Sequence, residues 1–361
     1  MKIMTILGTR PEIIRLSRII PKLDQVCDHT LVYTGQNYDH TLYTVFFKEL
    51  GLREPDYDLK CRSDFPMKQI GLILSRCEQV FLDKKPDRLL ILGDTNSALS
   101  AFVANRMGIP VYHMEAGNRC YDNRVPEEVN RRVIDHSSDI LLPYTERSRN
   151  NLLHEGIAGE RIFVTGNPII EVLDHYRAVI DASQVLEKFQ VESGNFFLVT
   201  MHRSENVDHP ERLKLFIDAF QCLAKRYGIP VLCSLHPRTR SQLLKHGVDI
   251  EKEGIRTFEP LGLCDFIHLE KNSKCVLTDS GTVQEECCIF GIPNVTIRDV
   301  TERPETIETG SNIISGAEPE SIINCVATAF SCSPDWTPPK EYSVNNVSSI
   351  VTKIMLGYMV K

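Results

Sequence analysis

The sequence predicts an α/β protein built from two doubly wound, Rossmann-like domains that face each other across a cleft. Two observations lead to this prediction. Short apolar runs alternate with amphipathic segments along almost the whole chain, and this alternation is typical of βαβ units and parallel sheets. The chain also has 361 residues, which is more than a single hydrophobic core usually serves, so two domains are expected.

The first domain is expected to cover residues 1–168. Its strands are short apolar runs at residues 3–7, 30–34, 88–92, 110–115, 140–142 and 162–164. Amphipathic patterns predict helices between these runs, for example over residues 67–84 and 97–106. A further helix is expected to begin at Pro126, because proline has no N–H to leave unpaired at the first helical position.

The second domain is expected over residues 169–342, after the turn at Gly166-Asn167-Pro168. Its strands are predicted at residues 196–200, 230–234, 275–278 and 294–297. The final segment, residues 343–361, contains a helix pattern over 347–359. A short terminal helix must bury its apolar stripe against a neighbour, so we expect this segment to pack back on the first domain.

Composition excludes several classes of protein. The formal charge of −7 leaves no general basic surface, which argues against nucleic acid as a partner. No run of 18 apolar residues and no leader pattern is present, so we expect a cytoplasmic protein without a membrane partner. Twelve cysteines without a C-x-x-C pair are expected to be small buried hydrophobic side chains. The scattered histidines have no metal-site spacing, so we expect no metal.

Unlike charges concentrate at the end of the expected strand 110–115 and in the loop and helix start that follow. The carboxylates are Glu115, Glu127 and Glu128, and the guanidiniums are Arg119, Arg124 and Arg131. Glu115 lies near the carboxyl end of its strand, where open α/β sheets place their ligands. The cluster favours chemistry on an anionic substrate. Glu127 and Glu128 alone could instead complement the helix dipole, for about 0.3–1 kcal/mol each.

Two other strand ends of the first domain carry candidate groups. Arg10 lies in Gly8-Thr9-Arg10-Pro11-Glu12 at a helix start, with Arg15 about one turn later. Backbone N–H groups and arginines suit a phosphate there, although a plain βα turn explains the motif equally well. Asp94 either takes part in catalysis or caps the next helix. The missing G-x-G-x-x-G motif argues against NAD.

The second domain carries a histidine and a donor-rich helix start. His202 follows a strand directly, beside Arg203 and Glu205, and is either catalytic or structural. Ser280-Gly281-Thr282 offers N–H and hydroxyl donors to a diphosphate. Glu285 or Glu286, one turn deeper, could bind ribose hydroxyls, and Arg303 adds a further cation before a helix-starting proline.

Seven motifs, which occur in order between about residue 1 and residue 310, together resemble the non-hydrolysing UDP-N-acetylglucosamine 2-epimerase family. They are Gly8-Thr9-Arg10-Pro11-Glu12, Gly93-Asp94-Thr95-Asn96-Ser97, Glu115-Ala116-Gly117, Pro126-Glu127-Glu128, His202-Arg203, Asp279-Ser280-Gly281 and Thr301-Glu302-Arg303-Pro304-Glu305. The resemblance implies a glycosyltransferase-B-like fold, a UDP-activated 2-acetamido sugar as substrate, no cofactor, and a homodimer.

The resemblance also implies roles for single residues. The positions that match the family's catalytic residues are Asp94, Glu115, Glu127 and His202. Its UDP-binding positions are Arg10, Ser280, Gly281, Glu286 and Arg303. Arg15 stands where many members have lysine, and Thr282 where many have a second glycine. The expected substrate-binding set is completed by these two residues with Gln36, Arg119, Arg203 and His236.

Departures from the family pattern indicate a branch. Asn118-Arg119-Cys120 replaces the common Leu-Arg-Thr, and the tail carries Asn345-Asn346-Val347-Ser348. Both are similar to the UDP-N-acetyl-L-fucosamine synthases of capsule and O-antigen pathways, which epimerise C2 of UDP-2-acetamido-2,6-dideoxy-L-talose. We favour that substrate over UDP-N-acetylglucosamine. Gln36-Asn37-Tyr38-Asp39 departs from the Gln-His-Arg stretch that holds an activating second sugar nucleotide, so we expect no such activation.

The expected reaction inverts C2 through loss and return of UDP, with a 2-acetamido-glycal between the two steps. The alternatives are a UDP-N-acetylglucosamine 2-epimerase that makes UDP-N-acetylmannosamine, a retaining glycosyltransferase, and a nucleotide-sugar sensor without catalysis. A transferase needs an acceptor site, and no motif identifies one.

Overall fold

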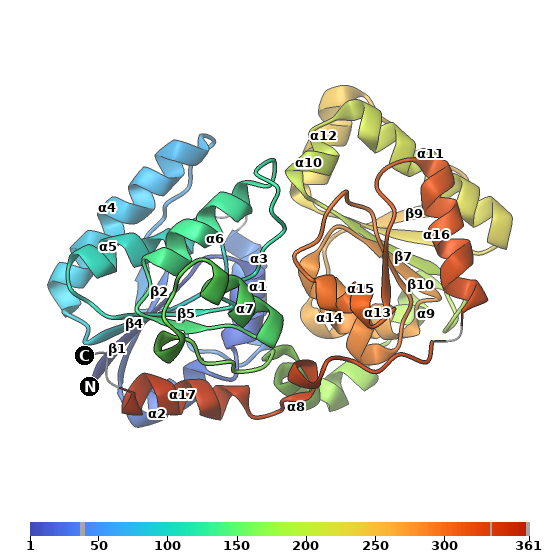
Figure 1. Cartoon of the computed structure of the whole chain (residues 1–361). Helices are drawn as coiled ribbons and strands as arrows, with labels where there is room; N and C mark the ends of the chain where they lie inside the picture. Colours follow the sequence, from blue (N-terminus) through green and yellow to red (C-terminus); the bar gives the residue numbers. More distant parts are fainter. Residues whose placement is uncertain (37–39, 333, 359–361) are drawn as a thin grey trace. The chain divides into compact units, whose positions relative to one another are not determined.

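The computed structural model describes residues 1–36, 40–332 and 334–358. The chain divides into two compact units, residues 1–175 with the segment from Lys340 onward, and residues 176–339. Each unit contains one six-stranded sheet of parallel strands (Figure 1). The predicted α/β class with two doubly wound sheets is therefore confirmed.

Unit 1 has the strand order β3-β2-β1-β4-β5-β6. The strands are β1 (Lys2–Leu7), β2 (Asp28–Tyr33), β3 (Tyr57–Asp58), β4 (Arg88–Leu92), β5 (Val111–Met114) and β6 (Ile140–Leu142). The chain starts in the middle of the sheet at β1, builds one edge, and then crosses back to β4. The loops after β1 and β4 therefore leave the sheet on either side of the point where the strand order reverses, which is where such sheets bind ligands.

Helices cover both faces of the unit 1 sheet (Figure 1), with α4 and α5 on one face and α2 and α17 on the other. The helices are α1 (Arg10–Leu16), α2 (Ile20–Val26), α3 (His40–Glu49), α4 (Pro66–Lys84), α5 (Ser100–Arg106), α6 (Pro126–His136), α7 (Glu146–His154), α8 (Ile169–Asp181) and α17 (Val347–Gly357), with short 3₁₀ turns η1 (Asn96–Leu99), η2 (Gly159–Arg161) and η3 (Lys340–Ser343). Ile73, Cys77 and Phe81 of α4 pack with Ile91 of β4 in one continuous core.

Unit 2 repeats this plan with the order β12-β11-β10-β7-β8-β9. The strands are β7 (Phe197–Met201), β8 (Val231–Leu235), β9 (Ile255–Phe258), β10 (Cys275–Thr278), β11 (Asn294–Thr296) and β12 (Asn312–Ile314). Its helices are α9 (Val185–Phe189), α10 (Ser204–Val207), α11 (Pro210–Tyr227), α12 (Pro237–His246), α13 (Leu263–Asn272), α14 (Gly281–Phe290), α15 (Pro304–Glu308) and α16 (Pro319–Ser331). The strand order reverses between β10 and β7, so the loops that follow these two strands lie at the expected binding edge.

Three strands of the structure were not predicted from the sequence, and one predicted strand is not a full strand. β3, β9 and β12 are edge strands, and β9 alternates buried and more exposed positions instead of presenting a continuous apolar run. The strand predicted at 162–164 is only an isolated bridge between Leu141 and Ile162. The helix predicted over 97–106 begins as the 3₁₀ turn η1 before it continues as α5.

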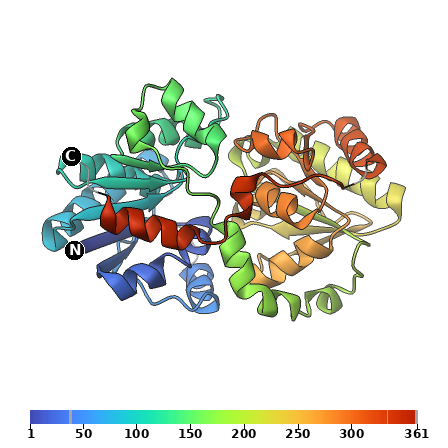
Figure 2. The same cartoon turned by 60° about the horizontal axis from the view of Figure 1, so that its bottom comes forward.

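The units divide at residues 175 and 176, inside α8, and not at the expected position between 168 and 169. The first turn of α8 packs within unit 1, because Glu171 accepts a 2.8 Å hydrogen bond from the Ser348 backbone N–H. Lys22 of α2 donates to Ser349 at 2.6 Å. Helix α17 (red in Figure 2) thus lies along unit 1 beside α2.

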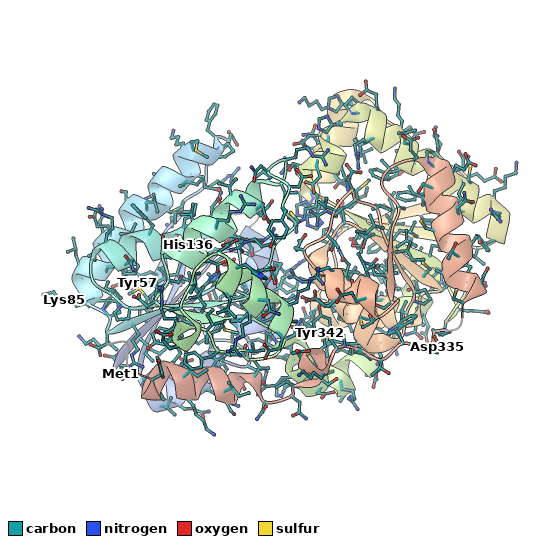
Figure 3. All side chains as sticks on the ribbon, viewed as in Figure 1. Met1, Tyr57, Lys85, His136, Asp335 and Tyr342 are labelled. Carbon is teal, nitrogen blue, oxygen red and sulfur yellow. The ribbon has the colours of Figure 1, made fainter. Side chains whose placement is uncertain are left out.

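The turn η3 also belongs to unit 1, although the expected second domain extended through residue 342. The reason is local packing. The Asn167 backbone N–H donates to the Glu341 carbonyl at 2.9 Å, and Tyr342, labelled in Figure 3, is buried.

No helix among the described residues has the length and apolar character needed to cross a bilayer. All twelve cysteines are free, and seven of them are buried. The buried ones include Cys77 of α4 and Cys275 of β10, whose thiol pKa values are raised by burial. Most of the cysteines therefore serve as small core side chains.

Candidate functional site

The carboxyl edge of the unit 1 sheet carries Asp94, two residues after the end of β4, and Glu115, directly after β5. Asp94 follows β4, and its carboxylate accepts from Arg131 of α6 at 2.8 Å to Nε and forms an ion pair with the same guanidinium at 2.7 Å. The residue that precedes η1 at its N-terminus is Thr95. Asp94 is therefore held by a buried arginine and does not act as the helix cap that was the alternative interpretation.

Glu115 adopts a left-handed backbone conformation, with φ of 65°. Residues other than glycine rarely adopt this conformation, and such strain concentrates at functional positions. Its carboxylate accepts from the Asn118 side-chain amide at 3.2 Å and lies 3.9 Å from the Arg15 guanidinium. The side chain is 12% exposed, so this carboxylate is desolvated on most sides but still reachable.

A buried histidine and aspartate connect the two strand ends. His113 of β5 lies between two acceptors, the Gly93 carbonyl and the Asp135 carboxylate, at 2.8 Å from each. Asp135 also accepts from the Gly117 backbone N–H at 3.1 Å. Burial alone would raise the pKa of Asp135, but the hydrogen bond and charge of His113 and the charge of Arg119 outweigh it, so the pKa lies below its usual value. His113 and Asp135 thereby fix the backbone that carries Asp94 and Glu115.

The structure separates the neighbouring glutamates of α6. Glu128 is fully buried and accepts from the backbone N–H groups of Cys120 at 3.0 Å and Tyr121 at 3.1 Å. It also binds Arg131 at 2.9 Å and Arg132 at 3.1 Å. Burial would raise its pKa, but the Cys120 N–H and Arg131 hold the pKa below the usual value. Glu128 therefore stabilises the loop, and Glu127, which is only partly buried, is the accessible carboxylate.

The loop after β1 is organised by Glu12. Its buried carboxylate accepts from the backbone N–H groups of Gly8 at 3.0 Å and Thr9 at 2.7 Å, and from the Thr95 hydroxyl at 3.1 Å. Burial raises the pKa of Glu12 to about 7 even though these hydrogen bonds lower it. Arg10, the first residue of α1, is exposed, with its guanidinium carbon 5.5 Å from the centre of the Phe46 ring.

Arg15 and Arg119 differ from the expected substrate contacts. Arg15 is 1% exposed, donates to Asn167 at 3.2 Å and lies beside Glu115. The Arg119 side chain has no exposed surface, because it forms ion pairs with Asp135 at 2.8 Å and Glu155 at 2.6 Å. In this structure the charge of Arg119 neutralises buried carboxylates, and its expected contact with substrate stays a prediction. His136, labelled in Figure 3, joins the outer end of this network at 3.3 Å from Glu155.

Gln36 is buried, and a Cβ added to Gly8 would meet its side chain at 3.2 Å. Gln36 thus lies next to the loop between β1 and α1. The rest of the motif Gln36-Asn37-Tyr38-Asp39 lies outside the described residues, so the expectation about activation by a second sugar nucleotide stays a prediction.

We expect Gly117→Ala to unfold the loop after Glu115. Gly117 has φ of 80°, and a Cβ there would lie 2.3 Å from the Ser148 backbone oxygen. The strained conformation alone costs about 1–3 kcal/mol, and the clash with backbone adds to it. Urea denaturation checks this, with Gly108→Ala as the control, because Gly108 has φ of 73° but an added Cβ meets nothing within 4 Å. Equal losses of stability in the two variants would contradict the expectation.

In unit 2, His202 follows β7 and pairs with buried Asp279, which follows β10. The His202 ring Nδ1 lies 3.2 Å from the Asp279 carboxylate. The same carboxylate accepts from the backbone N–H groups of His202 and Arg203, each at 2.9 Å, and from the Asn206 amide at 3.2 Å. Burial would raise the pKa of Asp279, but His202 and these hydrogen bonds lower it to about 2. His202 is one-third exposed, at 35%, with its orientation fixed by this carboxylate.

The start of α14 presents hydroxyls and backbone N–H groups. The Ser280 and Thr282 hydroxyl oxygens lie 3.1 Å apart. Close packing favours glycine at position 281, because a Cβ there would lie 3.1 Å from a Glu302 carboxylate oxygen. The N-terminus of a helix of ten residues with small donors suits a phosphate.

Other residues of unit 2 that were predicted to contact the substrate form hydrogen bonds to neighbouring groups of the protein. Arg303 is buried and donates to buried Glu285, and Arg203 donates to Glu302 at 3.0 Å. His236 is exposed and caps α12 by accepting from the Arg238 N–H at 3.2 Å. Its ring centre lies 5.4 Å from that of His202, so the two histidines share one edge of the sheet.

Sequence reasoning did not assign several residues that hold the candidate groups. Arg131 was only part of the charged motif, and His113, Asp135 and Asp279 were given no role. A polar residue inside a helix or at a buried strand end is the only signal that the sequence offers for such partners. Within the described residues, no group of three or more His, Cys, Asp or Glu side chains is arranged to hold a metal ion.

Comparison with known proteins shows what this arrangement resembles. The family profile described as UDP-N-acetylglucosamine 2-epimerase matches residues 22–355. A UDP-N-acetylglucosamine 2-epimerase of Methanocaldococcus jannaschii is 41% identical over 347 residues, which cover 94% of this chain and 95% of the relative. A UDP-2,3-diacetamido-2,3-dideoxy-D-glucuronate 2-epimerase of Pseudomonas aeruginosa is 36% identical over 336 residues, which cover 91% and 92%.

Solved structures agree. The crystal structure of Methanocaldococcus jannaschii UDP-GlcNAc 2-epimerase in complex with UDP-GlcNAc and UDP has a TM-score of 0.94 at 39% identity, and the match covers 98% of this chain and 99% of that one. A glycosyltransferase from Rickettsia africae matches with a TM-score of 0.57 at 12% identity over 99% of both chains. At that identity the likeness is one of fold alone, and it agrees with the expected glycosyltransferase-B-like fold.

Proposed function

The chain belongs to the UDP-N-acetylglucosamine 2-epimerase family of isomerases, and on that basis we propose that it inverts C2 of a UDP-linked 2-acetamido sugar. The observation that carries the proposal is the pair of carboxylates beyond adjacent strands of unit 1. Asp94 and Glu115 are each held by a buried arginine, Arg131 and Arg15. Such a pair suits proton transfer on a substrate more than it suits stability of the fold.

The reaction needs activation at C1 because the hydrogen on C2 is next to no carbonyl. In our proposal the C1–O bond breaks first, and UDP leaves with the bonding electron pair. The ring then gains oxocarbenium character, which makes the C2 hydrogen acidic. A carboxylate removes that proton, giving a 2-acetamido-glycal. Protonation of C2 from the opposite face and return of UDP to C1 complete the inversion.

We propose Asp94, Glu115 and Glu127 as the groups that remove and return the C2 proton, because inversion needs an acid or base on each face of the ring. His202 stabilises the charge of the departing phosphate or protonates it. The Ser280-Gly281-Thr282 helix start binds the diphosphate, and Arg10 supplies a further cation for it. Glu286 binds the ribose hydroxyls. Redox chemistry plays no part in this sequence of steps, so no cofactor is needed.

The similarity to UDP-N-acetylglucosamine 2-epimerases supports UDP-N-acetylglucosamine as the first candidate substrate. One observation favours UDP-2-acetamido-2,6-dideoxy-L-talose as the second candidate. Asn118, one of the residues that distinguish this branch, donates directly to Glu115 and accepts from Ser148 at 2.9 Å. The second branch motif has a structural explanation, because Ser348 binds Glu171 at the start of α17. Capsule or O-antigen synthesis and a homodimer remain parts of this proposal.

The deciding experiment is proton NMR of the purified protein in D₂O with UDP-N-acetylglucosamine, beside an identical sample with UDP-N-acetyl-L-fucosamine. The proposal requires loss of the H2 signal and the appearance of the 2-epimer in one of them. The sample that reacts identifies the substrate. Absence of exchange in both samples, with UDP still bound, would contradict the proposed reaction. Transfer that requires an added acceptor would identify a glycosyltransferase instead.

A further inference from the structure

Glu270 is a buried acid that the proposed mechanism does not use. It lies in α13, is fully buried, and faces Glu286 of the neighbouring helix α14, with the two carboxyl groups within hydrogen-bonding reach. Glu286 is itself 5% exposed. Two buried carboxyl groups in contact are unfavourable when both are ionised, because each loses hydration and the two charges repel.

The surroundings of Glu270 favour its protonated form. Its Oε1 accepts from the Cys287 thiol at 3.3 Å, and burial keeps that thiol protonated by raising its pKa. Its Oε2 receives no hydrogen bond from any described residue. Glu286 and Cys287 are the groups that act on its ionisation, and burial together with the Glu286 charge raises the pKa of Glu270 well above its usual value. A proton on Glu270 removes the repulsion between the two carboxylates, because the carboxyl group then donates to Glu286.

We propose that Glu270 is a positioning residue for ribose recognition: its protonated carboxyl group donates to the Glu286 carboxylate and orients it toward the two ribose hydroxyls of a uridine nucleotide. This inference rests on the proposed function, because it takes Glu286 as the ribose ligand. The geometry is local to unit 2. Glu286 lies in α14, which begins at Gly281, so the diphosphate donors and the ribose acceptor share one helix. Glu285, the residue before Glu286, forms an ion pair with Arg303.

The test compares UDP with 2′,3′-dideoxy-UDP by isothermal titration calorimetry on the full chain. The wild type is expected to bind UDP about 10- to 100-fold more tightly than the analogue, since the analogue leaves the Glu286 carboxylate without its hydroxyl donors. Glu270→Gln keeps this ratio, because its side-chain amide donates to Glu286 in place of the carboxyl group. Glu270→Met lowers UDP affinity about 10-fold and leaves affinity for the dideoxy analogue within about twofold.

Leu269→Met is the matched control, because Leu269 is a fully buried neighbour on the same helix. It is expected to change neither affinity, so a loss confined to Glu270→Met would not be a general packing effect. If Glu270→Met fails to fold, infrared spectroscopy of the wild type and Glu270→Gln near pH 8 provides the second measurement. The difference spectrum of the wild type minus Glu270→Gln must show the C=O stretch of a protonated carboxylic acid, because the fraction of Glu12 that is protonated, whose pKa is about 7, contributes equally to both proteins.

Three results would overturn the inference. Glu270→Met could keep the wild-type ratio of UDP affinity to dideoxy-UDP affinity, or the wild type could bind the two ligands equally well. The third result is that Glu270→Gln removes no infrared signal of a protonated carboxyl group. The proposed reaction is judged separately by H2 exchange in D₂O. If H2 exchange occurs but Glu270→Met does not change the affinity for UDP, only the role of Glu270 is overturned. If the ratios of UDP affinity to dideoxy-UDP affinity are as expected but no H2 exchange occurs, only the epimerase reaction is overturned.

Discussion

Replacing Glu115 or Glu127 with glutamine is expected to lower kcat about 10²- to 10⁴-fold, the usual contribution of a general acid or base. Affinity for UDP should stay within a few-fold, because the groups proposed to bind the nucleotide belong mainly to unit 2. Glutamine matches the shape of glutamate but does not accept a proton at neutral pH. The measurement is the rate of H2 exchange in D₂O, with UDP binding followed by calorimetry.

Glu128→Gln is the contrasting variant on the same helix. Glu128 holds two backbone N–H groups and two arginines, so its loss should lower the free energy of unfolding by about 3 kcal/mol. Glu127→Gln should change it by less than about 0.5 kcal/mol, as for other accessible positions. Wild-type turnover in both Glu115→Gln and Glu127→Gln would rule out these carboxylates as the proton-transfer groups.

Asp279→Asn is expected to destabilise the protein and to reduce its activity. The carboxylate accepts from the backbone N–H groups of His202 and Arg203 and pairs with the His202 ring. An asparagine side chain offers only one acceptor oxygen, and its NH₂ group faces a donor. We expect a loss of about 3 kcal/mol, because hydrogen bonds to charged groups contribute about 1.5–3 kcal/mol each. Urea denaturation measures the loss.

The matched control is Asp299→Asn in the same unit. Asp299 is 41% exposed and pairs with Arg212 at 3.2 Å, and exposed pairs contribute about 0–1 kcal/mol. A similar loss of stability in the two variants would show that the Asp279 carboxylate has no special structural role.

Asp279 also predicts a dependence of stability on pH. Its pKa in the folded protein is about 2, below the ordinary value of 3.8. A depressed folded-state pKa means that the stabilisation is present above the unfolded-state pKa and is lost as pH falls through the folded-state pKa. The contribution is about 2 kcal/mol, so the difference in stability between wild type and Asp279→Asn should shrink between about pH 4 and pH 2. A difference that stays constant over this range would contradict the ionised pair.

Local pattern was sufficient to predict most of the fold. Buried parallel strands such as β4 are continuous apolar runs, so they are visible in the sequence without knowledge of their partners. The three strands that were missed, β3, β9 and β12, are all edge strands, in which partly exposed positions break the apolar run. Residue 175 could not be identified as the boundary, because α8 continues through it without a break in pattern.

Local pattern likewise predicts some features of the candidate site and not others. A residue just after a strand of a parallel sheet must lie at the carboxyl edge of that sheet, so the apolar strand pattern was enough to place Asp94, Glu115 and His202 there. The choice between Glu127 and Glu128 required the folded structure, because adjacent helical positions point about 100° apart and local pattern does not show which one meets the Cys120 loop. The folded structure also shows that Arg119 is buried against Asp135, and that Glu270 faces Glu286. These contacts join residues that are distant in sequence, and they form only when packing brings their helices and strands together.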